Sequence, residues 1–213
     1  MSDFEKERKA VYDAMIGYKV QGITAAVNKA HEAGMPAMEI INTMGDAMSE
    51  VGVFFERGKL FLPHVLSAAN GMTAAVKSLE ACLPKDQVSK KLAKVCMGTV
   101  EGDVHDIGKS IVSTMMQCAG FEVVDLGRDV PNQLFISEIK NGCTYCGMSA
   151  LMTTTMSVMK NVIMILNENG LRDKVKILIG GAPVTQAYAD KIGADIYGES
   201  ASETTSKCKA LEV

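Results

Sequence analysis

The sequence predicts an α/β protein in which an N-terminal four-helix bundle cap precedes a C-terminal doubly wound, parallel, five-stranded sheet. Apolar side chains recur at helical spacing through residues 1–88, whereas short strand-like runs alternate with helical segments from residue 92 onward. A chain of 213 residues, 47% of them hydrophobic, is also long enough to form two buried cores. We therefore expect domains at 1–88 and 89–213, connected by a polar, charged linker at 84–91.

Four amphipathic segments with short breaks make up the first domain. Their apolar stripes are Val11, Ala14, Met15 and Tyr18; Ile23, Ala26, Val27 and Ala30; Met38, Ile41, Met44, Met48 and Val51; and Val65, Ala69, Met72, Val76 and Leu79. Gly34–Pro36 and Arg57–Lys59 interrupt the pattern, and Pro63 is well placed to begin the last helix. Connections this short are typical of an antiparallel bundle.

Strands and helices alternate in the second domain. We expect strands at 92–100, 121–126, 143–150, 175–179 and 195–197, and helices at 107–118, 132–140, 153–168, 184–192 and 201–211. This alternation predicts right-handed crossovers and a flavodoxin-like Rossmann sheet. In such sheets a ligand binds at the carboxyl ends of the strands, near the point where the strand order reverses.

Composition excludes several classes of protein. Lys and Arg number 22 and Asp and Glu 25, so the basic surplus of a non-specific nucleic-acid binder is missing. No apolar run reaches membrane-spanning length, and the charged first ten residues do not resemble a secretory signal, so we expect a cytoplasmic protein without membrane or nucleic-acid partners. The six cysteines should then be reduced thiols.

Cys143 and Cys146 form a C-x-x-C pair inside a predicted strand. Because side chains alternate along a strand, residues three apart should point to opposite faces of the sheet. We therefore expect both residues to behave as small buried hydrophobic side chains and to form neither a metal site nor a redox pair.

The segment Gly98–Lys109 follows the first strand, where an α/β sheet usually holds its ligand. Its glycines are spaced wrongly for a dinucleotide-binding loop, and Asp103 stands where a P-loop needs its first glycine. Because Asp103 and His105 are two residues apart in an extended loop, the carboxylate can reach one ring nitrogen and leave the other free to bind a metal. The alternative is a surface salt bridge.

Only three histidines occur in the sequence, so a zinc site built from several of them is nearly excluded. One protein ligand suffices only when a macrocycle fills the other positions around the metal. A metal centre that rests on His105 therefore requires a bound macrocycle.

Four motifs resemble those of the cobalamin-binding methyl-carrier proteins, in the family's order and over essentially the whole chain. They are the D-x-H-x-x-G of Asp103–Gly108, the G-x-S-x-L…T-T of Gly147–Thr154, the glycine pair in Gly180–Pro183, and the helical segment Val51–Pro63. The resemblance implies one corrinoid per chain, bound as methylcobalamin, cob(I)alamin or a related form.

The resemblance also implies roles for individual residues. His105 matches the lower axial ligand of cobalt, Asp103 its carboxylate partner, and Ser149 the hydroxyl that extends the relay. Residues expected to bind the nucleotide tail are Gly108, Gly180, Gly181, Ser149, Leu151 and Thr153, and those expected to cover the upper face of the corrin are Phe55 and Leu62.

By this resemblance the chain carries a methyl group on cobalt but is not a catalyst by itself. The segment Gly98–Pro131 is most similar to the trimethylamine and quaternary-amine branch, although dimethylamine also remains open as the donor. The implied partners are a substrate-specific amine methyltransferase, a second methyltransferase with a thiol-coenzyme or folate acceptor, and a reductive activation protein.

Three other functions remain as alternatives. A cobalamin-binding sensor would share both domains, but it would act on DNA only with a DNA-binding module, and we find no such pattern in this sequence. A phosphoacceptor receiver domain would need an Asp at the end of the third strand, where Gly147–Ser149 stand. An adenosylcobalamin isomerase would need a substrate barrel.

Overall fold

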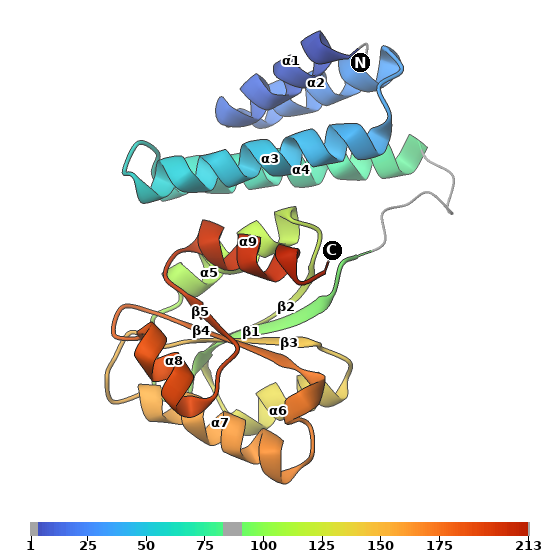
Figure 1. Ribbon diagram of the computed structural model, residues 1–213. Helices are drawn as coiled ribbons and strands as arrows, with labels where there is room; N and C mark the ends of the chain where they lie inside the picture. The colour runs from blue at the N-terminus through green and yellow to red at the C-terminus, as the bar shows by residue number, and fades with distance from the viewer. Residues whose placement is uncertain (1–3, 83–90, 213) are drawn as a thin grey trace. The chain divides into compact units, whose positions relative to one another are not determined.

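The computed structural model describes residues 4–82 and 91–212, and the chain divides into two compact units, Met1–Lys90 and Lys91–Val213. The predicted fold class is confirmed: helices form the first unit and a parallel α/β sheet the second (Figure 1). The predicted boundary between residues 88 and 89 lies outside the described residues, as does the predicted linker at 84–91 apart from Lys91.

The described part of the first unit consists of four helices. They are α1 (Glu5–Ile16), α2 (Val20–Glu32), α3 (Ala37–Glu56) and α4 (Leu62–Cys82). α1 packs on α2 and α3, and α4 packs on the same two helices. Met15, Ile23, Met44 and Leu79 are almost completely buried between them, as the helical stripes predict.

The second unit is a five-stranded parallel sheet in the order β2-β1-β3-β4-β5. Its elements are β1 (Lys94–Val100), α5 (Ile107–Cys118), β2 (Glu122–Val130), α6 (Asn132–Lys140), β3 (Tyr145–Ser149), α7 (Met156–Glu168), the 3₁₀ turn η1 (Arg172–Lys174), β4 (Lys176–Gly180), α8 (Gln186–Ile192), β5 (Ile196–Gly198) and α9 (Ala201–Ala210).

Helices cover both faces of this sheet. α5 and α9 lie on one face, and α6, α7 and α8 lie on the other (Figure 1). Because side chains alternate along a strand, β1 contributes Cys96 to the core that contains Phe135, and Met97 to the core that contains Met116. Within the described ranges no helix is both long and apolar enough to cross a bilayer.

Predicted and observed elements differ mainly at β2, at β3, and at α7, which begins at Met156 and not at residue 153. β2 continues to Val130, four residues beyond the predicted end, through register shifts against β1 near Gly98. β3 begins only at Tyr145, two residues later than predicted, after a turn in which Gly142 adopts φ 97°. α5 and α6 have the predicted bounds.

The cysteine pair is buried as predicted, but its two side chains do not point to opposite faces. Cys143 precedes β3, so strand alternation does not apply to it. Both cysteines belong to one core cluster, and the Cys96 thiol interacts with the thiols of Cys143 and Cys146. The prediction of opposite faces is therefore wrong.

Candidate functional site

The loops after β1 and β3 meet at the carboxyl edge of the sheet. The chain passes from β1 to β2 on one side and continues with β3 on the other side of β1, so the strand order reverses between β1 and β3. His105 and Asp103 lie in the loop after β1, and Leu151 and Thr155 follow β3. The site predicted from the sequence therefore lies where doubly wound sheets bind their ligands.

Asp103 is the buried centre of this edge, with a fully inaccessible side chain. Its Oδ1 accepts hydrogen bonds from His105 Nδ1, at 2.8 Å, and from the His105 backbone N–H, at 3.1 Å. Its Oδ2 accepts from the backbone N–H groups of Leu151 and Met152, at 2.8 and 3.1 Å, and from the Thr155 hydroxyl, at 2.9 Å.

These hydrogen bonds keep Asp103 ionised. Burial on its own would raise the pKa of this carboxyl group. The His105 side chain, the backbone N–H groups of His105 and Leu151, and the Thr155 hydroxyl outweigh that effect and hold the pKa well below its usual range. Asp103 therefore accepts the His105 contact as a carboxylate.

His105 is held in one tautomer by this contact. Because a carboxylate only accepts hydrogen bonds, Nδ1 carries the proton of this contact, and in the neutral ring the lone pair is therefore on Nε2. The side chain is 48% exposed, and the backbone carbonyl of His105 accepts a hydrogen bond from Thr99 Oγ1 at 3.0 Å. The predicted contact between Asp103 and His105 is present, and it leaves Nε2 suited to bind a metal.

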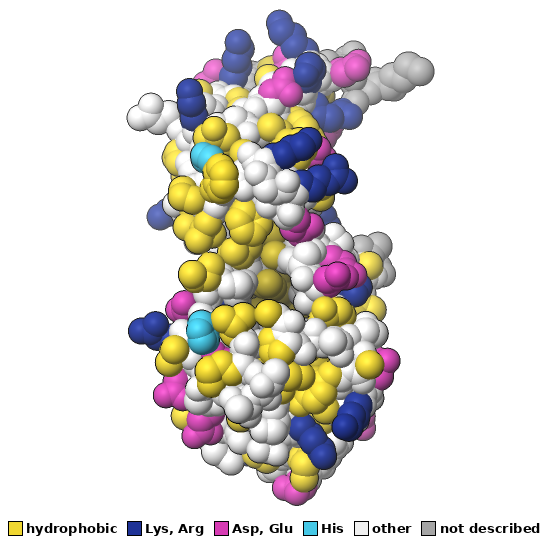
Figure 2. All heavy atoms as spheres, turned by 90° about the vertical axis from the view of Figure 1, so that its left-hand side faces the viewer, with side chains coloured by type: hydrophobic (Ala, Val, Ile, Leu, Met, Phe, Trp, Pro, Cys, Tyr) yellow, Lys and Arg dark blue, Asp and Glu magenta, His cyan; other side chains and the backbone are white. Residues whose placement is uncertain are grey.

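Large apolar side chains are exposed around His105. Val104 and Ile107, on either side of it in the chain, are 57% and 66% exposed, and Leu151 and Met152 are also exposed. Figure 2 shows hydrophobic side chains gathered on this face of the second unit. A single accessible imidazole beside a broad apolar surface fits a large, flat ligand that brings its own metal.

Three predicted glycines have different surroundings. A Cβ at Gly181, at φ 121°, would lie 1.9 Å from the Ala150 carbonyl oxygen, and a Cβ at Gly180 would lie 3.0 Å from that of Gly198. Protein packing alone thus requires glycine at 181 and favours it at 180. A Cβ at Gly108 would have no atom within 4 Å, so the protein itself does not require glycine there. Gly108 therefore fits a position that a ligand approaches.

Other predicted residues lie where the sequence suggests, but their roles stay predictions. Ser149 ends β3, and Leu151 and Thr153 are exposed in the loop that follows. Phe55 and Leu62, both half-buried, lie in the first unit on either side of the turn between α3 and α4.

Sequence reasoning missed Thr155. The sequence suggested Ser149 as the hydroxyl partner of Asp103, whereas the hydroxyl that reaches the carboxylate in this structure is that of Thr155. Thr155 is buried directly before α7. The run Thr153–Thr155 contained the signal, but only the folded loop shows which of its hydroxyls points inward.

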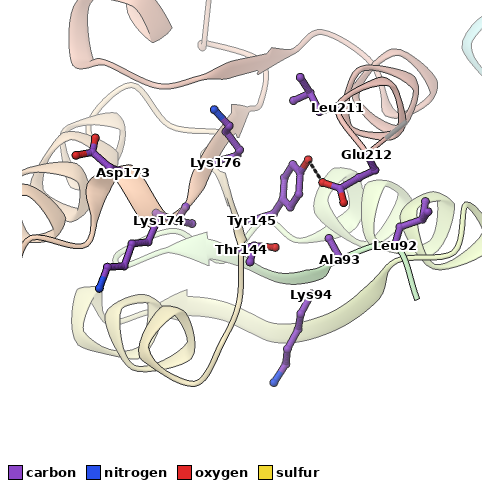
Figure 3. Close-up of a pocket in the computed structure, with 11 residues that line it drawn as sticks. Leu92, Ala93, Lys94, Thr144, Tyr145, Asp173, Lys174, Lys176, Leu211 and Glu212 are labelled. Carbon is purple, nitrogen blue, oxygen red and sulfur yellow. Dashed lines mark hydrogen bonds between the residues drawn. The ribbon is translucent and has the colours of Figure 1, made fainter. Parts of the chain in front are cut away.

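A cavity of about 470 Å³ lies at the opposite, amino edge of the sheet. Lys94, Tyr145 and Lys176, the first residues of β1, β3 and β4, line it, and the Tyr145 hydroxyl donates to Glu212 Oε1 at 2.6 Å (Figure 3). This cavity is separate from the His105 edge. In the ranges 4–82 and 91–212, no three His, Cys, Asp or Glu side chains are grouped to hold a metal ion.

Two family models match the chain. Both are described as a B12 binding domain, one over residues 7–80 and the other over residues 93–205. Together they match most of the helical unit and most of the α/β unit.

Named relatives are similar over most of the chain. Dimethylamine corrinoid protein 1 of Methanosarcina mazei is 54% identical over 214 residues, which covers 100% of this chain and 99% of the relative. The trimethylamine corrinoid protein of Methanosarcina barkeri is 50% identical over 186 residues, 86% of each chain.

A solved structure has the same architecture. It is the methanol:cobalamin methyltransferase complex of Methanosarcina barkeri, with a TM-score of 0.80 and 29% identity. The match covers 98% of this chain and 80% of that chain.

Proposed function

Because the chain belongs to the family of methylamine corrinoid proteins with B12-binding domains, we propose that it carries the methyl group of a methylated amine between two methyltransferases. The observation that carries this proposal is the pair of a buried Asp103 carboxylate and a half-exposed His105, at the carboxyl edge of the sheet. This pair fits the single protein ligand that a corrinoid needs.

The cofactor is a corrinoid, and its cobalt supplies the atom that takes up and releases the methyl group. His105 Nε2 is the atom that would bind the lower face of the cobalt, since Asp103 holds the proton on Nδ1. By accepting the hydrogen bond from Nδ1, Asp103 fixes the tautomer and the plane of the imidazole ring. The exposed Val104 and Ile107 would contact the corrin and exclude water from it.

The nucleotide tail of the corrinoid would lie along the ends of β3 and β4. The open space beside Gly108 supports its predicted contact, and Gly180, Gly181, Ser149, Leu151 and Thr153 are the other proposed contacts. In this assignment the α/β domain, proposed at 89–213, holds the cofactor, and the helical domain, proposed at 1–88, contributes Phe55 and Leu62 as its cover.

Dimethylamine is the donor that the relatives favour. A dimethylamine corrinoid protein is 54% identical to this chain, against 50% for the trimethylamine relative. The trimethylamine and quaternary-amine branch suggested by residues 98–131 is thus supported less strongly than dimethylamine.

A substrate-specific methyltransferase is the partner best supported, because the matched solved structure is a complex with such an enzyme. The second partner transfers the methyl group to a thiol coenzyme or a folate, and an activation protein restores the reduced cobalt. A cytoplasmic location fits the free thiols of Cys96, Cys118, Cys143, Cys146 and Cys208.

The metal-binding role of His105 is tested by electron paramagnetic resonance of the protein loaded with cob(II)alamin. We expect nitrogen hyperfine splitting from His105 in the unaltered protein, its loss in His105→Ala, and its retention in His64→Ala. His64 is the control because it lies in the first turn of α4 and accepts the Phe61 backbone N–H. The histidines are labelled with ¹⁵N, so that their splitting differs from that of the cofactor's ¹⁴N benzimidazole, and ¹⁵N splitting that persists in His105→Ala would contradict the assignment.

The donor is tested by a panel of amines. The loaded, reduced protein is mixed with a dimethylamine-, trimethylamine- or quaternary-amine-specific methyltransferase and the matching amine. We expect methylation of the cobalt to be fastest with dimethylamine and its enzyme, followed in the visible spectrum. Faster methylation with another pair would replace dimethylamine as the proposed donor, and methylation with none would refute the carrier function.

A further inference from the structure

The loop that contains Asp103 and His105 has little structure of its own. Residues 101–106 contribute no helix or strand, and Gly102 adopts φ 83°. Such a loop keeps one geometry only if neighbouring elements hold its backbone. The Asp103 carboxylate is fixed from the β3 side by Leu151 and Thr155, but these bonds leave the main chain of Gly102 and Asp103 to other partners.

Asp129, near the end of β2, holds that main chain at two points. Its Oδ1 accepts a hydrogen bond from the Gly102 backbone N–H at 2.7 Å. Its own backbone N–H donates to the Asp103 carbonyl oxygen at 2.9 Å. One residue, 27 positions along the chain from Gly102, thus holds the backbone N–H of Gly102 and the backbone carbonyl of Asp103, just before His105.

The backbone of Asp129 is adapted to this contact. It has φ 53°, a left-handed conformation that few residues other than glycine, asparagine and aspartate adopt. The register shifts between β1 and β2 bring this end of β2 past Gly98 toward the loop. Non-glycine residues persist in this conformation when surrounding contacts over-determine it, and they gather at functional sites.

The end of β2 is itself anchored. Asp125 Oδ1 accepts the Gly127 backbone N–H at 2.8 Å and forms an ion pair with Lys109, whose side chain is buried in α5. α5 follows directly after the His105 loop. The loop is therefore held by Asp129 of β2, and β2 is itself bound through the Asp125–Lys109 ion pair to α5, the helix that follows the loop.

We propose that Asp129 is a positioning residue for His105. By fixing the backbone of Gly102 and Asp103, Asp129 holds His105 Nε2 in one position at the carboxyl edge of the sheet. This inference rests on the proposed role of His105 as a cobalt ligand. Without the Asp129 carboxylate, the loop would sample other backbone conformations and the imidazole would reach the cobalt in a smaller fraction of molecules.

Three variants separate the functions of Asp129. Asp129→Gly tolerates φ 53° but removes the acceptor, whereas Asp129→Asn tolerates the conformation and keeps an oxygen acceptor. Glu101→Gln is the matched control, because Glu101 is exposed in the same loop and its side chain forms no hydrogen bond or ion pair with the described residues. Each protein is labelled with ¹⁵N-histidine and loaded with cob(II)alamin. Electron paramagnetic resonance then measures the ratio of histidine-ligated cobalt to all other cobalt, because ¹⁵N of histidine and ¹⁴N of the cofactor's benzimidazole split the signal differently.

We expect Asp129→Gly to lower this ratio about tenfold, as loss of a hydrogen bond to a charged group predicts. Asp129→Asn should remain within about threefold of the unaltered protein, and Glu101→Gln should not change it. An unchanged ratio in Asp129→Gly, or a folded Asp129→Asn as impaired as the glycine variant, would overturn the inference. If Asp129→Gly unfolds, Asp129→Asn alone decides.

The proposed function is tested separately by the same spectra. An unaltered protein without histidine ligation would refute the axial role of His105, and this inference with it. A ligated unaltered protein with an unchanged Asp129→Gly would leave that role intact and refute the positioning role alone.

Discussion

At the scale of single residues, the half-exposed imidazole proposed as the metal ligand is oriented by a carboxylate buried beneath it. Asp103 lies fully inside the protein, yet five hydrogen bonds keep it charged. That charge determines which nitrogen of His105 carries the proton. A buried residue therefore sets the orientation of the surface histidine, as the proposed single-ligand site requires.

A substitution at Gly108 distinguishes a glycine needed for protein packing from a glycine needed to leave room for the cofactor. In Gly108→Ala the new Cβ meets no protein atom, and alanine favours a helix more than glycine does, so we expect the free energy of unfolding without cofactor to rise by about 0.5–1 kcal/mol. If the nucleotide tail passes this position, the same methyl group should weaken cobalamin binding about tenfold or more. Chemical denaturation and a binding titration measure the two effects.

Gly181→Ala is the comparison for this prediction. Its Cβ would clash with the Ala150 carbonyl, so the protein should lose stability even without cofactor. Unweakened cobalamin binding by Gly108→Ala would show that the tail does not approach residue 108.

The D-x-H-x-x-G pattern was enough to predict the contact between Asp103 and His105, because a spacing of two in an extended loop fixes which side chains can meet. The pattern could not identify Thr155 or Asp129 as neighbours of Asp103. Their contacts depend on how the loop after β3 folds inward and on the left-handed backbone at Asp129. Neither property leaves a periodic signal in a sequence.

At the scale of elements, a segment was predictable where its apolar pattern coincided with turn residues. α5 and α6 have the predicted bounds, and Thr185 caps α8 through a hydrogen bond from the Tyr188 backbone N–H. The end of β2 was not predictable, because Asp129 is held by contacts with the loop after β1, and Gly127 by a hydrogen bond to Asp125 within β2. That unpredicted extension is the part that reaches the proposed site.

Cys208 links α9 to the pH dependence of stability. Burial, then the nearby Glu212, raises the pKa of this thiol to about 12, against about 8.5 for an exposed cysteine. A raised pKa contributes stability that is complete below pH 8.5 and is lost as the pH rises toward 12, because only the unfolded chain then releases the proton. The slope from one such thiol is about 1.4 kcal/mol per pH unit.

Cys208→Ser removes this proton from both states. The variant's stability at pH 7 does not affect this test. Between pH 9 and 11 we expect its free energy of unfolding to fall less steeply than that of the unaltered protein, by about 1.4 kcal/mol per pH unit. Urea denaturation at several pH values gives the slopes. Glu203→Gln, on the same helix, is the control and should keep the steep slope; equal slopes for Cys208→Ser and the unaltered protein would contradict the prediction.

At the scale of the whole molecule, both units match B12-binding domains, although His105 belongs to the α/β unit alone. A cobalt that reacts readily with a methyl donor also reacts with oxygen and water, so a carrier needs protection as well as a ligand. Phe55 and Leu62, half-buried at one end of the helical unit, are the residues proposed to protect it.

Phe55→Ala and Leu62→Ala test whether the helical unit protects the cobalt while the α/β unit supplies its ligand. Because neither residue supplies the cobalt ligand or lines the proposed tail site, we expect cobalamin affinity to change less than about threefold in either variant. Oxidation of the reduced cobalt by dissolved oxygen should accelerate about three- to tenfold, since a smaller apolar side chain admits water and oxygen more freely.

Stopped-flow absorbance after mixing with aerated buffer measures this rate. The control is Met38→Ala, which truncates an exposed apolar side chain near the other end of α3. Oxidation rates equal to those of Met38→Ala would show that the helical unit acts in some other way than through these two side chains.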